Sequence, residues 1–412
     1  MAQNRVCLTS ARTGTNPAPR HARYFQYLLA ALATLGPFSI DTYMPSFPAM
    51  GAALAASPLQ VQHTLTAYLL AFAAMMLFHG ALSDAYGRRP IVLWSLLLYT
   101  VASVACVFAT DINALLALRA VQGASAGAGL VIGRAMIRDL YAGAEAQRLM
   151  SRVTMIFGIA PAIAPILGGW LHTWFGWRAI FMFLAVFGAA LFAVCLRYLP
   201  ETLPHTARES FHPKPLFANY RKVGAHPEFQ WLSLAVGLNF AGFFLYIASA
   251  PVFIIQHLHL GEHQFGWLFI PAVSGIVLGA YLSGRMAGKY TLRQTVRYAF
   301  LISFAAAGLN VLYNLAALPA LPWAVLLVML YGTGMSLAMP SISLLNLELY
   351  PRNRGMVSSL QGVIHTLGST LAAGFLSPWL AHSPLLLALG MLGCLLGGWL
   401  AWRAYLRAAK HA

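Results

Sequence analysis

Charged residues are scarce in this chain of 412 residues: Asp, Glu, Lys and Arg together make up 9%, and only 10 residues are acidic. A soluble domain of this size needs about 25% charged residues to cover its surface, so a water-soluble protein is excluded. Cysteine is scarce as well, and the four cysteines form no CxxC pair, so we expect neither a disulfide framework nor a metal site. With so few acids and no paired nucleophile and base, we expect no enzyme and no cofactor.

Apolar residues dominate instead: they make up 59% of the chain, and the mean hydropathy is +0.69. Twelve apolar segments are each long enough to cross a hydrocarbon core of about 30 Å. In lipid every backbone polar group must be satisfied within its own segment, which predicts helices. We therefore expect an all-α polytopic membrane protein in a lipid bilayer. Its twelve transmembrane helices are predicted at residues 24–46, 60–82, 91–109, 114–137, 149–171, 178–199, 229–255, 264–286, 294–317, 322–347, 356–377 and 385–405.

The distribution of Lys and Arg predicts how these helices are oriented. If the N-terminus is cytoplasmic, the even-numbered loops are cytoplasmic too and hold nearly all the basic loop residues, whereas the other side has only Arg178. This excess predicts that both termini are cytoplasmic, and it explains the net charge of +16 without a nucleic-acid partner. The basic residues of the even-numbered loops are Arg88, Arg89, Arg138, Arg148, Arg152, Arg208, Lys214, Arg221, Lys222, Arg285, Lys289, Arg293, Arg297, Arg352 and Arg354.

A proline-rich stretch, residues 200–228, follows the sixth predicted helix. Proline-rich polar segments typically connect domains, so we expect a cytoplasmic linker here. Two halves of six helices with a central cavity between them are typical of transporters. The predicted parts are a cytoplasmic tail at 1–23, a first half at 24–199, the linker, a second half at 229–405 and a cytoplasmic tail at 406–412.

The loop between the second and third predicted helices reads GALSDAYGRRP. Its glycines permit close approach and positive φ, and its charges can pair with neighbouring helix ends. A short basic loop alone would not require the ordered spacing G-x-L-x-D-x-x-G-R-R, and a weaker echo, GRMAGK, occupies 284–289 in the second half. The candidate residues are Gly80, Asp84, Gly87, Arg88 and Arg89.

The fourth predicted helix carries Arg119 inside its apolar run, in the pattern L-x-x-R-x-x-Q-G that also contains Gln122. Arginine keeps its proton at any ordinary pH, so a buried Arg119 needs acceptors or water. The alternative is a side chain that snorkels to the outer surface. Arg138 and Asp139, at the inner end of this helix, are expected to join the cluster of the GALSDAYGRRP loop.

The fifth predicted helix contains GIAPAIAPILGGW. Each proline removes a backbone donor and bends the helix, and the paired glycines make one face thin. The candidate residues of this motif are Gly158, Pro161, Pro165, Gly168 and Gly169.

These motifs resemble signatures of the major facilitator superfamily. In that family the loop motif latches the cytoplasmic side during alternating access, the helix-4 motif is associated with proton coupling, and G-x-x-x-G-P-x-x-G-G on helix 5 is an antiporter signature, which here has Ala164 in place of one glycine. The stretches IDTYMP, IRDLY and FAGFFLYIASAP resemble the bicyclomycin/chloramphenicol-resistance subgroup. The resemblance implies a monomeric antiporter of the bacterial inner membrane that exports small drugs in exchange for protons. Export of a metabolite, such as a small peptide or amino-acid derivative, remains the alternative.

Asp41 lies in the first predicted helix among apolar, small and hydroxylated residues. A carboxylate in the middle of a membrane costs roughly 2.5–3.5 kcal/mol, so it indicates function by default. The alternatives are a structural ion pair or a carboxylate that is wet near the exterior. An opening cavity changes the hydration of such a group, so drug and proton can prefer different states of the protein. We therefore expect Asp41, with Arg119 and Gln122, to couple proton movement to transport.

The superfamily resemblance also predicts a substrate pocket between the halves, where aromatic side chains provide large contact areas for varied ligands. Relatives in the subgroup can carry a second acid on helix 1, but Ala33 stands there, which favours neutral or singly charged substrates. The candidate substrate-binding residues are Phe38, Tyr43, Tyr68, Asn239, Phe243 and Tyr246.

The stretch HLHLGEH contains H-x-x-E-H, a spacing found in some zinc enzymes. That chemistry requires a helix that presents both histidines on one face, and Gly261 interrupts this short segment. We therefore expect no metal-dependent enzyme here, although the pattern leaves metal contacts of His257, His259 and His263 open.

Overall fold

The computed structural model of the protein describes residues 22–141, 143–208, 211–350 and 354–409. Most of the predicted N-terminal tail, part of the C-terminal tail and the basic residue Arg352 lie outside these residues. Within them the chain is helical throughout, without a β-strand, as the sequence predicts.

All twelve predicted segments are helical. The first half contains α1 (Ala22–Asp41), α3 (Pro58–Tyr86), α4 (Arg88–Val107), α5 (Ile112–Ala126) continued by α6 (Ala128–Leu140), α7 (Gly143–Phe175) and α8 (Trp177–Tyr198). The second half contains α10 (Pro227–Ala248), α12 (Gly266–Met286), α13 (Leu292–Ala316), α14 (Trp323–Leu349), α15 (Arg354–Leu371) and α17 (Pro384–Ala408). Shorter elements are α2 (Phe47–Ala53), α9 (Pro213–Gly224), α11 (Ala250–Val252), α16 (Ser377–Leu380), the π-helices η3 (Phe253–His257) and η5 (Ala372–Leu376), and the 3-10 turns η1 (Met44–Ser46), η2 (His205–Ala207) and η4 (Glu262–Gln264).

Ten helices of the described chain are long and apolar enough to cross a membrane. The first and eleventh helices of the predicted set, α1 and α15, are not among these ten. They belong to the same bundle, because α1 packs along α7, and α15 packs along both α3 and α10. The all-α membrane fold predicted from the sequence is therefore confirmed.

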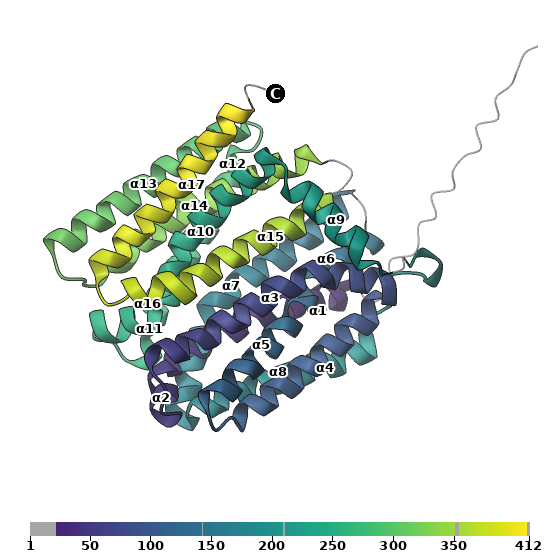
Figure 1. Ribbon diagram of the computed structural model, residues 1–412, viewed down its shortest axis with the longest axis horizontal. Coiled ribbons are helices and arrows are strands. Elements are labelled where there is room, and N and C mark those ends of the chain that lie inside the picture. Colours follow the sequence, from purple (N-terminus) through teal and green to yellow (C-terminus); the bar gives the residue numbers. More distant parts are fainter. Residues whose placement is uncertain (1–21, 142, 209–210, 351–353, 410–412) are drawn as a thin grey trace, which may run out of the picture.

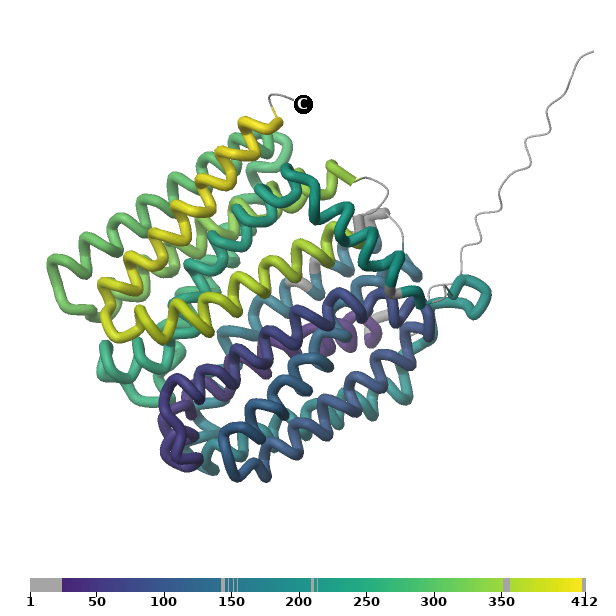
Figure 2. The backbone as a smooth tube through the Cα atoms, viewed as in Figure 1, coloured from purple at the N-terminus to yellow at the C-terminus, as the bar shows by residue number. Residues whose placement is uncertain are grey.

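The two halves form separate groups of helices, purple to teal and green to yellow in Figure 2. They meet where α3 packs against α15 and where α7 packs against α12, and α3 and α15 run side by side in Figure 1. Helix α9 lies in the connection between the halves and contacts α10 and α15. We call the end of the bundle where α3 ends and α4 begins, at Arg88, the basic end, and the other the opposite end.

Two of the predicted helices end earlier than expected. Helix α1 stops at Asp41 rather than continuing to residue 46, because Pro45 has no N–H to donate to the Asp41 carbonyl. Helix α10 stops at Ala248, ahead of Pro251, and a short α-turn and a π-helix continue the chain. Asp41 therefore sits at the last residue of its helix, not within its interior.

Candidate functional site

A cavity of about 400 Å³ lies between the two halves. Most of its wall comes from α1, α3, α6 and α7 of the first half and from α10, α14 and α15 of the second. Ser343, near the end of α14, and Ser358, near the start of α15, both line it, so the cavity extends toward the basic end. Small-molecule sites typically measure roughly 300–1,000 Å³, so this cavity has room for a drug-sized molecule.

The lining of the cavity is apolar on most sides and polar along α15. The large apolar residues are Phe72, Met76, Phe157, Phe240, Phe244 and Met339. The polar residues of α15 are Ser358, Gln361, His365, Thr366 and Ser369. Arg134 of α6 also lines the cavity, whereas no acidic residue of the described chain does. The site thus combines a large apolar surface with one permanent positive charge.

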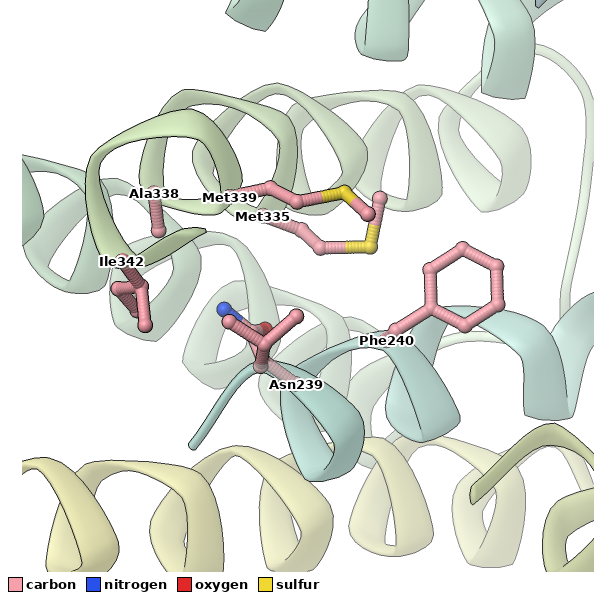
Figure 3. Close-up of a pocket in the computed structure, with 7 residues that line it drawn as sticks. Asn239, Phe240, Met335, Ala338, Met339 and Ile342 are labelled. Carbon is pink, nitrogen blue, oxygen red and sulfur yellow. The ribbon is translucent and has the colours of Figure 1, made fainter. Parts of the chain in front are cut away.

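A second, much smaller pocket adjoins the cavity and shares Val236, Phe240 and Met339 with it. Figure 3 shows Met335 and Met339 between their own helix and the helix that carries Asn239 and Phe240. Flexible methionine side chains adapt to ligands of different shape. This corner of the site is therefore suited to varied apolar groups.

Asp41 is buried, with 4% of its surface exposed. It follows Ile40 and lies one turn beyond Pro37, both of which line the cavity, so it sits just past the end of the cavity that is farther from the basic end. Asp41 makes no ion pair or hydrogen bond with any side chain of the described residues. Of the alternatives drawn from the sequence, a structural ion pair is therefore absent within the described chain.

Arg119 is fully buried rather than snorkelling to the surface. Its guanidinium lies over the ring of Tyr43 at 4.2 Å and over that of Tyr68 at 4.4 Å, two cation–π contacts. It donates hydrogen bonds to the Gln122 side chain and, at 2.9 Å, to the backbone carbonyl of Ser39. Arg119 thus ties α5 to the end of α1, two residues before Asp41.

Gln122 extends this network to α4. Its amide nitrogen donates to the Ser103 hydroxyl at 2.7 Å, while its amide oxygen accepts from Arg119. Ser39 also contacts the hydroxyl of Tyr99 on α4 at 2.5 Å. The predicted pair of Arg119 and Gln122 therefore forms a polar junction of three helices, α1, α4 and α5.

The predicted substrate-binding residues do not come together in the cavity. Tyr43 and Tyr68 are fully buried around Arg119, and Phe38 packs against Phe183 and Phe187 of α8. In the second half, Phe243 lies against Gly332, and the Tyr246 hydroxyl accepts a hydrogen bond from Asn310 at 2.8 Å. Asn239 lines the smaller of the two pockets described above, and the other five residues line neither of these two. Their contact with substrate remains a prediction.

The opposite end is closed by contacts between the halves. The side-chain nitrogen of Gln62 on α3 donates to the carbonyls of Ala248 and Ala373, at 3.2 Å each. The Nε2 atom of His172 on α7 lies 2.8 Å from the carboxylate of Glu262 in η4, a contact between the halves. Ala373 belongs to the π-helix η5, an irregular element of a kind that is frequent at functional sites.

The helix-5 motif lies on α7 and takes part in this closure. A Cβ atom at Gly168 would lie 1.8 Å from the carbonyl oxygen of Thr42, and one at Gly169 would lie 2.5 Å from that of Glu262. Gly168 therefore lets the end of α1 approach, and Gly169 lets the other half approach. A Cβ atom placed at Gly158 would meet no neighbouring atom within 4 Å. Pro161 and Pro165 lie inside α7.

At the basic end, Arg88 and Arg89 of the GALSDAYGRRP loop contact Asp84 and the helices α6 and α8. Arg88 pairs with Asp84 at 2.5 Å and with Asp139 of α6 at 3.1 Å. Arg89 donates to the Leu196 carbonyl at 2.6 Å. Arg138 is exposed and has no such partner among the described residues. Gly80 leaves open space toward Val131, whose nearest atom is 4.0 Å from a Cβ placed there.

Glu201, directly after α8, completes this cluster and was not predicted from the sequence. Its carboxylate accepts hydrogen bonds from the backbone N–H groups of Arg88 at 3.0 Å and Arg89 at 3.3 Å, which are unpaired donors at the start of α4. Gly87 has a φ of +103°, and a Cβ there would lie 2.5 Å from Glu201. In the sequence, Glu201 follows the end of a predicted helix, and this position alone gives only a weak indication that it caps another helix. All these groups belong to the first half and the linker.

The HLHLGEH stretch serves the closure of the opposite end. Glu262 pairs with His172, and His257 contacts the carbonyl of Ala381 at 2.7 Å. Within the described residues, no group of three or more metal-ligating side chains is present. Glu262, the acidic residue of this stretch, therefore contacts the other half of the protein.

Comparison with known proteins agrees with this architecture. The chain matches the Major Facilitator Superfamily over residues 29–373. It is 29% identical to a bicyclomycin resistance protein homolog of Haemophilus influenzae, over 82% of this chain and 85% of that protein. It is 30% identical to a chloramphenicol resistance protein of Pseudomonas aeruginosa, over 76% of this chain and 73% of that protein.

A solved structure shares the fold at 17% identity, with a TM-score of 0.73 over 95% of this chain and 97% of that one. It is a bacterial homolog of the human lysosomal transporter Spinster, in an inward-facing and occupied conformation. The chain therefore belongs to the Major Facilitator Superfamily of membrane transporters, and its resemblance to the bicyclomycin/chloramphenicol-resistance subgroup is confirmed.

Proposed function

We propose that this transporter exports small drugs across the bacterial inner membrane in exchange for protons, by alternating access, with both termini in the cytoplasm. The observation that carries the proposal is the cavity of about 400 Å³, which extends toward the basic end and stops below the contacts between Gln62 and the second half. With the basic end in the cytoplasm, this is an inward-facing state that takes up substrate from the cytoplasm.

Asp41 is the proposed proton-coupling group. It is the only buried acidic residue of the described chain and has no ionic partner there. The next residue, Thr42, packs on α7 at Gly168, beside the contacts that close the opposite end. Opening that end would change the hydration of the carboxyl group, and proton binding by a carboxyl group depends on hydration. Substrate and proton would then favour different states, which is sufficient for coupling.

Arg119 acts as a positioning residue in this mechanism. Its hydrogen bond to the Ser39 carbonyl and its place between Tyr43 and Tyr68 hold the last turn of α1 against α3 and α5. The driving force is sufficient, because moving one charge through 100 mV provides about 2.3 kcal/mol. The names of the similar resistance proteins favour drugs as cargo. The row of polar side chains on α15 also suits a small peptide, the alternative cargo.

Purified protein in liposomes with an imposed pH gradient tests the proposal. The wild type should couple proton flux to the transport of drugs such as chloramphenicol, and a parallel panel of dipeptides separates the two classes of cargo. Asp41→Asn should abolish accumulation against the gradient, because an amide cannot carry a proton. Asp111→Asn is the matched control, since Asp111 is an exposed helix cap where asparagine serves equally well.

Proton release on adding substrate to detergent-solubilised protein is the decisive measurement. Equal release by the wild type and Asp41→Asn would show that another group carries the proton. Absence of substrate-dependent proton flux across the whole panel would contradict proton-coupled export itself. Coupling to dipeptides alone would replace drugs by a metabolite as the cargo.

A further inference from the structure

We propose that the central cavity selects amphipathic substrates with one negative charge, and that Arg134 is the residue that binds this charge. The inference rests on the proposed export function, and it adds a substrate class. The juxtaposition that carries it is an arginine without a partner in an otherwise largely apolar cavity that has no acidic residue among its described lining.

Arg134 differs from Arg88 and Arg119, the two arginines that are buried in the described part of the first half. Arg119 is enclosed by aromatic rings and hydrogen-bonded, and Arg88 has two carboxylate partners. Arg134 projects into the cavity, is exposed there, and makes no ion pair or hydrogen bond with the described residues. Its planar guanidinium offers five N–H donors in a fork that matches a carboxylate. Its donors are therefore free to bind a ligand in the cavity.

No acidic residue of the described chain forms an ion pair with Arg134. Asp84 and Asp139 are both engaged with Arg88 at the basic end, and Asp41 is buried beyond the other end of the cavity. The next charged residue on α6 is Arg138, one turn further along, which adds to the positive potential. A cleft lined by one sign of charge concentrates ligands of the other sign. The cavity should therefore favour anions over cations.

The rest of the lining defines the body of the substrate. Phe72, Phe157 and Phe240 offer flat apolar surfaces for an aromatic or aliphatic group. On α15, the Nε2 atom of His365 is buried without a hydrogen-bond partner, although the ring lies 3.8 Å from that of Phe240. Gln361 and Thr366 of the same helix line the cavity and can meet a polar group on the substrate. The lining thus fits a molecule with a carboxylate, an apolar body and a hydrogen-bonding group, such as an N-acylated amino acid.

The test uses dansylglycine, a fluorescent monocarboxylate, and dansylglycinamide, its neutral counterpart. Purified wild-type protein should bind the acid roughly tenfold or more tightly than the amide, as a charge-assisted hydrogen bond permits. Arg134→Gln should bring the ratio of the two affinities to about one, and Arg134→Lys should keep part of the preference. Arg297→Gln is the charge-matched control, because Arg297 is exposed on α13, which does not line the cavity.

Equal affinity of the wild type for both probes would overturn the inference, and this result does not depend on any variant folding. A preference for the acid that persists in Arg134→Gln would overturn it as well. A preference lost equally in Arg297→Gln would show a general charge effect and contradict a role for Arg134. If Arg134 confers the preference but no probe or drug drives proton flux in liposomes, the binding site stands and the proposed export fails.

Discussion

Gly169→Ala should open the contact between the halves at the opposite end. A methyl group at this position would lie 2.5 Å from the Glu262 carbonyl oxygen and 2.9 Å from the His263 Cα atom. Both atoms belong to the backbone of the other half, so no side-chain rotation relieves the overlap. The halves must therefore move apart at this end.

The cost applies to one conformational state only. Inserting a methyl group into a packed site costs about 1–3 kcal/mol, and here the overlap exists only while the opposite end is closed. A penalty of this size shifts the ratio of open to closed states by about 5- to 150-fold. Gly168→Ala provides a contrast, because its overlap with Thr42 at 1.8 Å lies within the first half and persists in both states. It should lower the thermal stability instead.

Pulsed electron paramagnetic resonance can measure the separation of the halves. Spin labels at residues 59 and 318, exposed at the start of α3 and in the loop before α14, report on the opposite end in a variant without native cysteines. Gly169→Ala should add a population at longer distance. Gly158→Ala is the control on the same helix, with nothing within 4 Å, and should leave distances unchanged. Identical distance distributions for Gly169→Ala and the wild type would refute the reasoning.

Three further predictions concern the polar network, the basic end and the orientation. Arg119→Lys keeps the charge but loses at least one charge-assisted hydrogen bond of about 1.5–3 kcal/mol. Proton-driven exchange in liposomes should therefore fall roughly tenfold or more. Unchanged exchange would contradict the positioning role of Arg119. Glu201→Ala removes the acceptor for two backbone N–H groups of α4 and should destabilise the protein by about 1–2 kcal/mol, seen as a lower Tm; an unchanged Tm would show that water replaces the cap. An impermeant thiol reagent on intact cells should label Arg178→Cys from outside and leave Lys214→Cys unlabelled, and the reverse pattern would overturn the topology.

The sequence alone was sufficient for the features that depend on short stretches of chain. Hydropathy located all twelve helices, because each must satisfy its own backbone in lipid. The charges of the GALSDAYGRRP loop were expected to pair with neighbouring helices, and Arg88 does pair with Asp139 of α6. The contact between Arg119 and Gln122 follows from helical periodicity, because residues three apart on one helix are neighbours. Pro45 also carried the signal that ends α1 at Asp41, although the predicted helix ran past it.

Only the tertiary structure decided which residues face the cavity. Tyr43 and Tyr68 are aromatic residues near the predicted site, yet they enclose Arg119, whereas Arg134 lines the cavity. An ionisable residue inside a membrane helix was a signal for Arg134, but the sequence does not contain the rotation of α6 about its axis. That rotation depends on packing between helices far apart in the chain, as does the meeting of His172 with Glu262 across the two halves. Local periodicity predicts a helix, and contacts between distant helices determine what each of its faces meets.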